Sequence, residues 1–436
     1  MRVGIIGGGI AGLLAGYELS KVGAHVTIFE REQRIGGLAS SFALGPQSEI
    51  ERYYHFICKP DRAYLDMIRE LGLASHLRWV TTKMGLFYKG AMYTIGDPLN
   101  LLMFPHFSVG DKLRFLWAAA MAKFGNNWRA IENIPAEKWL VQHYGRRAYD
   151  VLYAPLLNLK FRAHASRISA AWMWARFHRL GNSRTIAQQE RLGYLEGGTQ
   201  LYIAALEQAL RRQGATLYTG TMVERVVVDD GRVVGVQCNG KQLSFDSVLS
   251  TVPVPQFLEF VADTNGSYFD HLHRLEYIDV LVIVLRLRHS FSPYFWMNIS
   301  DPQIELAGII EYTNLNPSPQ LGGEAILYVP QYLPSSHPLY SLAEEDLFRL
   351  YCEYLHYINP AFRPNWVRDY WVHRDRFAQP ICDIGFSRHI LPIQTPVAGL
   401  YMTDSYQLHP DDRTISGSTN LGRRAAELIL KQWKAR

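Results

Sequence analysis

The chain has 436 residues, of which 48% are apolar, 19% charged and 13% aromatic, and its formal net charge is +5. This length is enough for two or three domains with sizeable apolar cores. The small net charge and the absence of a basic run exclude a dedicated nucleic-acid-binding protein, and we expect a small molecule as the partner.

Four cysteines, Cys58, Cys238, Cys352 and Cys382, stand far apart in the sequence. No C-x-x-C pair occurs, so the spacing indicates neither a zinc site nor a dithiol, and we expect no metal. A reduced cytoplasmic protein is the simplest interpretation. The first strand is predicted to start at residue 2 or 3, so we expect no signal peptide. No run of about 18 apolar residues predicts a membrane-spanning helix.

The N-terminus contains a glycine-rich motif between a strand and a helix. Residues 3–12 read V-G-I-I-G-G-G-I-A-G, and residues 10–22 predict an amphipathic helix. Gly7 permits the tight turn out of the strand, Gly9 lets the backbone approach a pyrophosphate, and Gly12 lets the helix pack against the sheet. The free N–H groups of the first helical turn attract phosphates.

A second strand follows over residues 26–31 and carries Glu30 at its end, about 20 residues after the motif, where a ribose hydroxyl is expected. Gly36 and Gly37 come next and let another stretch of backbone pass close to a ligand. A βαβ unit whose glycines serve only its turn would not explain Glu30 together with the second glycine pair. The context therefore favours a dinucleotide site.

The run Glu30-Arg31 followed by Gly36-Gly37-Leu38-Ala39-Ser40 resembles the extended fingerprint of two-domain FAD enzymes. That superfamily includes flavin amine oxidases, protoporphyrinogen oxidases, phytoene-type desaturases and UDP-galactopyranose mutase. Many members carry Arg directly after the glycine pair, whereas this chain has Leu38. A phosphate contact would then come from Arg31 or Arg34. The resemblance implies FAD as the cofactor and an α/β fold with a Rossmann-like (GR2-type) FAD-binding domain.

Residues 61–72 predict another helix, and from about 75 to 190 the pattern is mainly helical. One stripe with helical spacing contains Leu113, Leu116, Trp117, Ala120, Met121 and Phe124, flanked by Lys112, Arg114 and Lys123. The stripe is typical of a core-facing helix, and a helix at a membrane surface is the alternative. Peripheral membrane contact of a cytoplasmic protein therefore stays open.

Near residue 195 the pattern changes, because Gly197-Gly198-Thr199 precedes a helix that ends at Gly214. Short strands are expected after it at Thr216–Tyr218, Met222–Val228, Val233–Gln237 and Gln242–Thr251. A plain β-meander would show the same strands, but the order of elements resembles the return of the chain to the cofactor domain in the FAD enzymes. The resemblance implies that the backbone of Val223 holds the adenine.

Residues 265–390 predict a strand-rich region, with strands at Val280–Leu287, Leu306–Tyr312 and Glu324–Val329 and a helix at Leu342–Ile358. With residues 76–189 this region is expected to form a discontinuous α+β substrate-binding domain. Residues 1–75, 190–264 and 391–436 are then left for the FAD-binding domain.

The C-terminus carries a second cofactor signature. Residues 397–404 predict a strand ending in Thr403-Asp404, and residues 410–418 lead into a helix that runs to Lys434. In the FAD enzymes a strand ending in Gly-Asp puts the Asp on the ribityl chain, and the following helix N-terminus faces the N1–C2 carbonyl edge of the flavin. A helix N-terminus stabilises negative charge there. The alternative is a terminal helix that only packs on the sheet.

The resemblance implies a set of cofactor-binding residues from these motifs. They are Gly7, Gly9, Ile10, Ala11, Gly12, Glu30, Arg31, Gly36, Gly37, Leu38, Ala39, Val223, Asp404, Thr414, Ile415 and Ser416.

Candidate catalytic residues lie where family chains pass the flavin ring. Tyr54 and His55 follow the second glycine pair, and His55 is either a proton carrier near neutral pH or a hydrogen-bonded structural histidine. Lys160 is a candidate for orienting a water at flavin N5, although a surface lysine is the commoner case. Arg376 precedes the last strand of the cofactor domain and is expected to line the pocket.

The cofactor carries the chemistry, and the aromatic content suits a lipophilic substrate such as an isoprenoid or a porphyrinogen, or else an amine. We expect oxidation or desaturation by hydride transfer to flavin N5. A non-redox enzyme resembling UDP-galactopyranose mutase, which acts on a nucleotide sugar, is the alternative, although its full pattern of substrate arginines is missing. A flavin-binding protein without catalysis is a third. The oligomeric state has no signal in the sequence.

Overall fold

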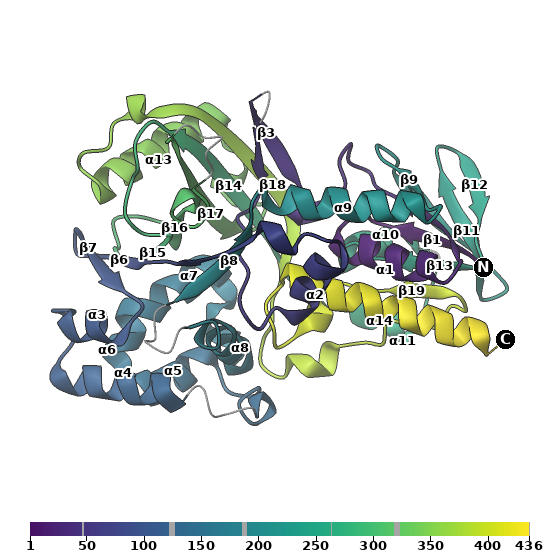
Figure 1. Cartoon of the computed structure of the whole chain (residues 1–436). Coiled ribbons are helices and arrows are strands. Elements are labelled where there is room, and N and C mark those ends of the chain that lie inside the picture. Colours follow the sequence, from purple (N-terminus) through teal and green to yellow (C-terminus); the bar gives the residue numbers. More distant parts are fainter. Residues whose placement is uncertain (46–47, 122–126, 185–189, 263, 318–322, 436) are drawn as a thin grey trace.

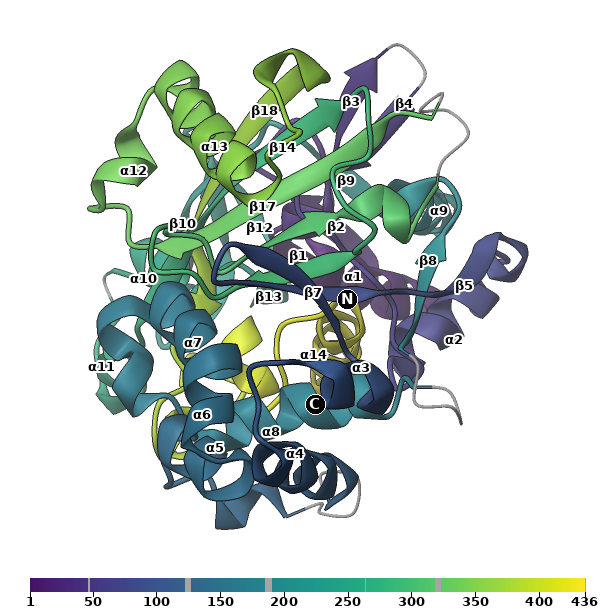
Figure 2. The same cartoon turned by 90° about the vertical axis from the view of Figure 1, so that its left-hand side faces the viewer.

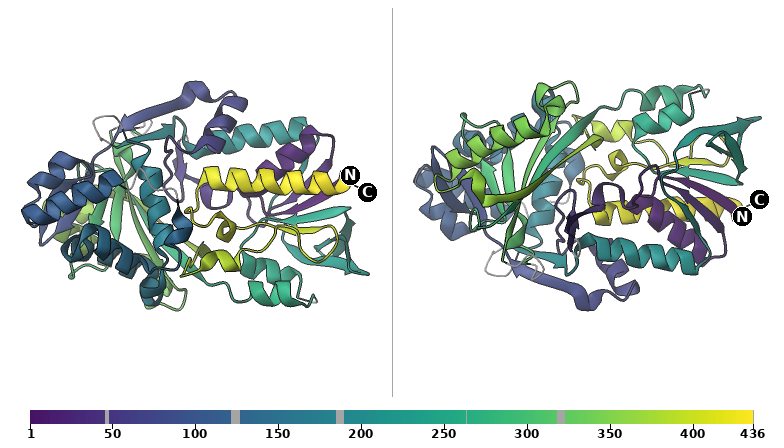
Figure 3. Two further views of the ribbon diagram at one scale, coloured as in Figure 1. Left: turned by 90° about the horizontal axis from the view of Figure 1, so that it is seen from below. Right: turned by 90° about the horizontal axis from the view of Figure 1, so that it is seen from above.

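The structure is a computed structural model that describes residues 1–45, 48–121, 127–184, 190–262, 264–317 and 323–435. Its two main sheets lie side by side, with a parallel sheet at one end of the molecule and a mixed sheet at the other (Figure 1). Both chain termini lie at the end of the parallel sheet that is remote from the mixed sheet (Figure 3).

The parallel sheet has five strands in the order β19-β13-β1-β2-β9. They are β1 (Arg2–Ile6), β2 (His25–Phe29), β9 (Thr216–Tyr218), β13 (Ser247–Ser250) and β19 (Leu400–Met402). All neighbouring pairs are parallel, with Ile5 opposite Ile28 on one side and Leu249 on the other. The buried apolar strands and the helices between them confirm the Rossmann-like α/β fold.

Helices α1 (Ile10–Lys21), α9 (Gly198–Arg212) and α14 (Ile415–Lys434) pack together beside this sheet (Figure 1). At the crossing of α1 and α14, a Cβ at Gly422 would lie 2.4 Å from the carbonyl oxygen of Ala11. Only glycine allows this approach of the two helices. Helix α2 (Arg62–Glu70) packs against α14 on the same side.

An antiparallel meander of β10 (Val223–Asp229), β11 (Arg232–Cys238) and β12 (Lys241–Ser244) follows β9. The expected strand Gln242–Thr251 is wrong as a single element. The chain leaves the meander after Ser244 and enters the parallel sheet as β13. Asp246 links the chain to β1 at this point. Its backbone N–H donates to the carbonyl oxygen of Arg2, and its carboxylate accepts from the N–H of Arg2.

The mixed sheet has seven strands in the order β18-β14-β17-β16-β15-β6-β7. They are β6 (Met84–Tyr88), β7 (Ala91–Ile95), β14 (Tyr277–Leu287), β15 (Trp296–Ile299), β16 (Gly308–Glu311), β17 (Ala325–Leu333) and β18 (Val367–Pro380). All pairs are antiparallel except β15 with β6. Strands β15 and β18 are absent from the sequence-based prediction.

Both faces of the mixed sheet are covered. Along β14, Leu281, Ile283 and Leu285 pack in one apolar cluster with α13 (Glu344–Ile358), while Val282 and Val284 belong to a cluster on the opposite face. This alternation is the period of two that a strand imposes. Figure 2 shows α13 on one side of the sheet and a layer of helices on the other.

That layer contains α3 (Pro98–Met103), α4 (Val109–Met121), α5 (Ala136–Tyr144), α6 (Arg146–Ala148), α7 (Ala154–Phe161) and α8 (Ala170–Gly181). The prediction that residues 75 to 190 are mainly helical is wrong at the start, where β5 (Leu77–Thr81), β6 and β7 are strands. These segments are short and rich in aromatic or β-branched residues, and the β6–β7 hairpin turns at Lys89 and Gly90, which both have positive φ. Strand β5 pairs with β8 (Arg191–Leu195).

Smaller elements complete the chain: the hairpin β3 (Ser41–Gly45) with β4 (Ser48–Glu51), and helices α10 (Val254–Phe260), α11 (Ser267–Leu272) and α12 (Pro338–Ser341). The division into two discontinuous domains at the expected boundaries stays a prediction.

The apolar stripe on α4 differs from the expected core-facing pattern. Leu113 and Trp117 are 62% and 59% exposed, whereas Leu116 is half-buried and Ala118 is buried. The core-facing interpretation is therefore wrong for Leu113 and Trp117. Phe124 and Lys123 lie outside the described residues.

Candidate active site

A cavity of about 890 Å³ runs from the glycine-rich loop after β1 to the mixed sheet. This volume lies in the upper part of the ~300–1,000 Å³ range of ligand sites. Its walls include all but one of the predicted site residues: Gly7, Gly9, Ile10, Ala11, Glu30, Arg31, Gly36, Gly37, Leu38, Ala39, Tyr54, His55, Lys160, Val223, Arg376, Asp404, Thr414, Ile415 and Ser416. The exception, Gly12, lies behind the loop.

The glycines of the loop have different tasks. A Cβ at Gly9 would meet only the Cα of Gly37, at 3.9 Å, so the space in front of Gly9 is open to a ligand. A Cβ at Gly12 would lie 2.0 Å from the carbonyl oxygen of Gly7, so Gly12 serves the packing of α1 against the turn. Gly7 itself has φ +104°, which an L side chain rarely adopts.

The cradle around Gly9 suits a dinucleotide. The second glycine pair is tied to the first motif, because the N–H of Gly36 donates to the carbonyl oxygen of Gly8 at 2.8 Å. No side chain caps the start of α1 at Gly9, so its first N–H groups are available to a phosphate. The Glu30 carboxylate lines the cavity and is held by the N–H groups of Gly8 (2.8 Å) and Glu32 (2.9 Å).

Arginines near the glycine pair divide between the cavity and the surface. Arg31 lines the cavity, whereas Arg34 forms an ion pair with Glu49 at 2.8 Å. Arg52 also lines the cavity and donates to the carbonyl oxygen of Gly37 at 2.9 Å. Arg52 belongs to the run after the glycine pair where chains of the resembling family pass the flavin ring, and its place in that run is the signal for it.

The C-terminal signature lies at the centre of the cavity wall. Asp404 accepts hydrogen bonds from Val254 N–H (3.1 Å), Ser405 Oγ (2.9 Å) and the Tyr277 hydroxyl, and burial raises the pKa of its carboxyl despite them. Thr403, directly before Asp404, is fully buried. Thr414 caps α14 by accepting from the N–H of Gly417 at 2.9 Å, so this helix presents its N-terminus to the cavity.

Aromatic side chains line the far end of the cavity. Tyr54 packs edge-on against Trp296, with ring centroids 5.3 Å apart, and Phe56, Tyr332 and Phe377 lie on the same walls. Burial raises the pKa of Tyr54 well above its ordinary value, so its hydroxyl stays protonated. This end of the cavity offers apolar surface to a substrate.

The hydrogen bonding of the His55 ring is incomplete, although the backbone of Tyr53 interacts with it. Its Nδ1 is buried and has no hydrogen-bond partner among the described side chains and backbone. The ring touches solvent-accessible space at the cavity, and protein surrounds its other sides. Burial and the charge of Arg413 lower the pKa of His55 to about 4, which argues against a proton carrier near neutral pH.

Lys160 is not a surface lysine, because only 5% of it is exposed. Its Nζ lies 3.7 Å from Asp412 Oδ2 and about 5 Å from the ring centroids of Trp172 (4.9 Å) and Tyr332 (4.8 Å). Burial lowers the pKa of Lys160 below its ordinary value.

Arg376 sits at the rim, where β18 bulges away from β14. The pairing of the two strands jumps from Ile278 opposite Gln379 to Val280 opposite Asp375, and Phe377 in the bulge has φ +56°. Asp279 holds the bulge by accepting from the N–H of Phe377 at 2.7 Å. The Arg376 guanidinium is exposed and lies 4.6 Å from the Phe377 ring centroid.

Three further charged residues of the cavity have no role in the sequence analysis: Arg176 on α8, and Asp412 and Arg413 directly before α14. The signal for the last two was their place before a helix that faces the ligand. Within the described ranges, no group of three His, Cys, Asp or Glu side chains is placed to hold a metal ion.

Comparisons with known proteins agree with this geometry. The family described as flavin containing amine oxidoreductase matches residues 10–430. The zeta-carotene desaturase of Synechocystis sp. is 23% identical over 320 residues, which cover 66% of this chain and just under two thirds (65%) of that relative.

Solved structures share the fold. A candidate protoporphyrinogen oxidase from Exiguobacterium sp. 255-15 aligns over 99% of both chains with 18% identity and a TM-score of 0.76. A reduced UDP-galactopyranose mutase aligns over 99% of this chain and 96% of its own, with 17% identity and a TM-score of 0.74. The resemblance to two-domain FAD enzymes is confirmed, and the chain belongs to the flavin-containing amine oxidoreductase family as an FAD-dependent oxidoreductase.

Proposed function

We propose that this enzyme oxidises or desaturates a lipophilic small molecule. The observation that carries the proposal is the single cavity that joins a nucleotide cradle at the glycine-rich loop to an aromatic chamber at the mixed sheet. When bound, FAD would supply the chemistry, since N5 accepts a hydride from a substrate C–H bond and oxygen, a quinone or another acceptor reoxidises the flavin. The carotene desaturase among the relatives supports a lipophilic substrate.

The chain's own residues would bind and orient the two molecules. Gly9, Glu30 and the N-terminus of α1 would hold the pyrophosphate and ribose, and Asp404 with the N-terminus of α14 would hold the ribityl and flavin end. Tyr54 and Trp296 would pack on the substrate and exclude water. His55, neutral at pH 7, would act as a hydrogen-bond partner because its pKa is too low for a strong base.

The test begins with the purified protein, which should be yellow and show flavin absorbance. Anaerobic mixing with candidate isoprenoids or porphyrinogens should bleach that absorbance. A protein that neither retains nor takes up FAD would contradict the proposal, and so would a holoprotein that no lipophilic substrate of these classes reduces.

A second candidate is a non-redox reaction on a nucleotide sugar, as in the mutase named above. The specific observation that favours it is the excess of positive charge in the cavity from Lys160, Arg176 and Arg413. Turnover of a nucleotide sugar only after reduction with dithionite would support this candidate. The same positive charge disfavours a protonated amine, because like charges at a buried site repel.

We further propose that the protein contacts a membrane surface through the α3–α4 patch. The patch consists of Leu102 and Met103 on α3 and Val109, Leu113 and Trp117 on α4, which are 44%, 74%, 74%, 62% and 59% exposed. Scattered exposed apolar residues are ordinary, but five large ones on two successive helices form a docking surface. No helix in the described ranges has the length and apolar character to cross a bilayer.

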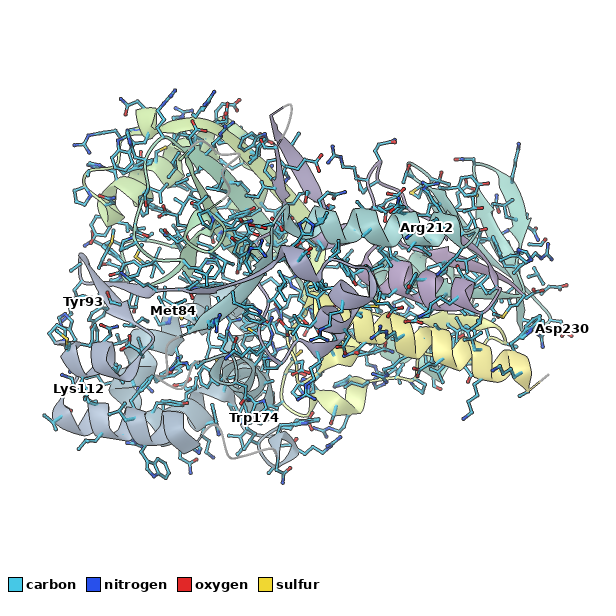
Figure 4. All side chains as sticks on the ribbon, in the orientation of Figure 1. Met84, Tyr93, Lys112, Trp174, Arg212 and Asp230 are labelled. Carbon is cyan, nitrogen blue, oxygen red and sulfur yellow. The ribbon has the colours of Figure 1, made fainter. Side chains whose placement is uncertain are left out.

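Charge next to the patch favours an anionic lipid surface. Lys112 and Arg114 flank the apolar side chains of α4, and Arg147 donates to the carbonyl oxygen of His106, just after α3. Figure 4 places Lys112 at a corner of the molecule remote from Arg212 and Asp230, which mark the cofactor end. Apolar side chains with basic neighbours are typical of interfacial helices.

Sedimentation with vesicles tests the contact. We expect binding to vesicles that contain phosphatidylglycerol, weaker binding to phosphatidylcholine alone, and loss of both in a Leu113→Asp/Trp117→Asp double variant. Trp433→Asp, at a 40% exposed tryptophan near the C-terminus, is the matched control and should bind as the wild type does. Equal binding of the double variant and the control would refute the contact.

A further inference from the structure

Three cationic side chains from separate elements meet at the aromatic end of the cavity. They are Lys160 on α7, Arg176 on α8 and Arg413 before α14, and we call them the cation cluster. The nearest carboxylate is Asp412, whose Oδ2 lies 3.7 Å from Lys160 Nζ and 3.3 Å from Arg176 Nη1. Three positive charges and one negative charge leave a net charge of +2 at this place.

Two other sets of charged groups at this end are already paired with each other. Arg179 donates to Asp61 through two hydrogen bonds of 2.9 and 2.7 Å. Arg52 and Asp375 form an ion pair at 3.4 Å. Neither pair is available to balance the cation cluster.

Some hydrogen-bond donors of the cation cluster have no acceptor among the described residues. Within the described residues, no hydrogen bond is made by the ammonium group of Lys160, which has three protons to donate. Arg413 donates to the Tyr332 hydroxyl at 2.8 Å and to the carbonyl oxygen of Ala378. A buried charge without compensation is costly, so a partner from outside the chain is expected.

A buried acceptor lies beside the cluster. Gln379 is 2% exposed, and its Nε2 donates to Asp412 Oδ1 at 3.0 Å. Its Oε1 is buried and has no hydrogen-bond partner among the described residues. Gln379 lines the cavity, so an unused acceptor lies in the side chain that holds Asp412 beside the cluster.

The pKa values of Tyr332 and Asp412 are shifted in the direction that an excess of positive charge produces. Burial alone would raise the pKa of Tyr332, but Arg413 and then Lys160 outweigh burial and lower it. Burial would likewise raise the pKa of Asp412, and the three cations hold it at about 2. The field at this end of the cavity is therefore positive.

We propose that the cation cluster binds an anionic oxygen group, a phosphate or a carboxylate, that the substrate carries. The proposal rests on the function proposed above, in which FAD fills the cradle end and the substrate fills the aromatic end. The FAD pyrophosphate belongs at Gly9, so it does not explain the cluster. The substrate is then an amphiphile whose apolar part faces Tyr54 and Trp296 and whose anionic group meets Lys160 and Arg176.

The test uses the protein loaded with FAD, so that the cradle is filled. Inorganic pyrophosphate and glutarate are titrated separately, and binding is followed by calorimetry and by changes in flavin absorbance. Saturable binding of pyrophosphate alone assigns a phosphate, and binding of glutarate alone assigns a carboxylate. We expect Lys160→Met and Arg176→Gln to weaken that binding by about tenfold or more.

A variant that should strengthen anion binding shows whether the weaker binding of the other variants is caused by misfolding. Asp412→Asn removes the only carboxylate seen beside the cluster in the described structure, and it should tighten anion binding while FAD stays bound. Arg212→Gln, on α9 at the far end of the molecule, is the neutral control (Figure 4).

Several results would overturn the proposal. One is an FAD-loaded protein that binds neither anion. Another is a set of variants that shift the flavin reduction potential but leave anion affinity unchanged, since the cations would then serve the flavin. Failure to hold FAD would instead overturn the proposed function and this inference with it.

Discussion

Gly9 and Gly12 stand three positions apart in one motif, yet the structure gives them separate tasks. Gly9 borders open space, and Gly12 is pressed against the carbonyl oxygen of Gly7. The spacing of the motif predicted both tasks, because they follow from backbone geometry alone. Binding and folding can therefore be separated by substitution at these two positions.

We expect Gly9→Val to fold normally and to lose FAD. Gly9 has φ −74° and ψ 177°, which valine adopts freely, and its side chain would fill the space that the pyrophosphate needs. Flavin absorbance after purification and the melting temperature are the measurements. Gly181→Val, where a Cβ meets nothing within 4 Å, is the matched control.

Gly12→Val should instead destabilise the protein, because its Cβ would clash with backbone. A Gly9→Val protein that retains FAD at the wild-type level would show that the phosphates lie elsewhere.

His55 should make the FAD-free protein sensitive to acid. Its pKa falls from about 6.5 when unfolded to about 4 when folded, so the unfolded state binds the proton first as the pH falls. Stability from this residue is complete above pH 6.5 and is lost toward pH 4, by about 3 kcal/mol. Urea unfolding of wild type and His55→Gln across this range is the measurement.

The free energy of unfolding of His55→Gln should depend less on pH than that of the wild type. At pH 8, where His55 is neutral in both states, the difference between the two proteins reports only the change in packing. If the stability of both proteins fell equally with pH, the lowered pKa of His55 would not be the cause of the acid sensitivity.

Residues that meet only in the folded chain could not be predicted from the sequence. The cofactor residues were found because each belongs to a local motif. Lys160, Arg176 and Arg413 come from three distant segments, and no spacing in the sequence shows that they meet.

At the scale of elements, the long strand β18 shows why a functional strand escapes prediction. It is an edge strand, it mixes runs of charged residues with aromatic ones, and it bulges at Phe377. Edge strands tolerate charge, so the hydrophobic period that reveals a buried strand is diluted. Strand β14 (Tyr277–Leu287), buried on both faces, was predicted from Val280 to its end at Leu287.

We expect Asp279→Ala to disturb the bulge of β18. The carboxylate is 6% exposed and accepts from the N–H groups of Phe377 (2.7 Å) and Ser335 (2.8 Å). Loss of these bonds should lower the free energy of unfolding by about 2 kcal/mol. Substrate affinity should fall as well, because Arg376 and Gln379 flank the bulge, while FAD binding should persist.

Asp279→Asn, which keeps one acceptor oxygen, should have an intermediate effect in the same denaturation experiment. A variant Asp279→Ala as stable as the wild type would show that the bulge is held by the surrounding sheet alone.

At the scale of the whole molecule, all four cysteines are buried and unpaired. Burial raises the pKa of Cys58 to about 12 and of Cys352 to about 11. A thiol reagent should therefore modify less than one cysteine per folded chain at pH 8 and all four after denaturation. Rapid labelling of the folded protein would show that the interior opens far more readily than this packing suggests.

The strand order β19-β13-β1-β2-β9 has a consequence for how the enzyme is made. The glycine-rich loop leaves the ribosome long before strand β19 and helix α14, which complete the sheet and cover α1. The nascent chain must keep the α14-facing side of α1 uncovered until α14 has been made. Both halves of the FAD site are present only from that point on, and before it the chain depends on protection from aggregation.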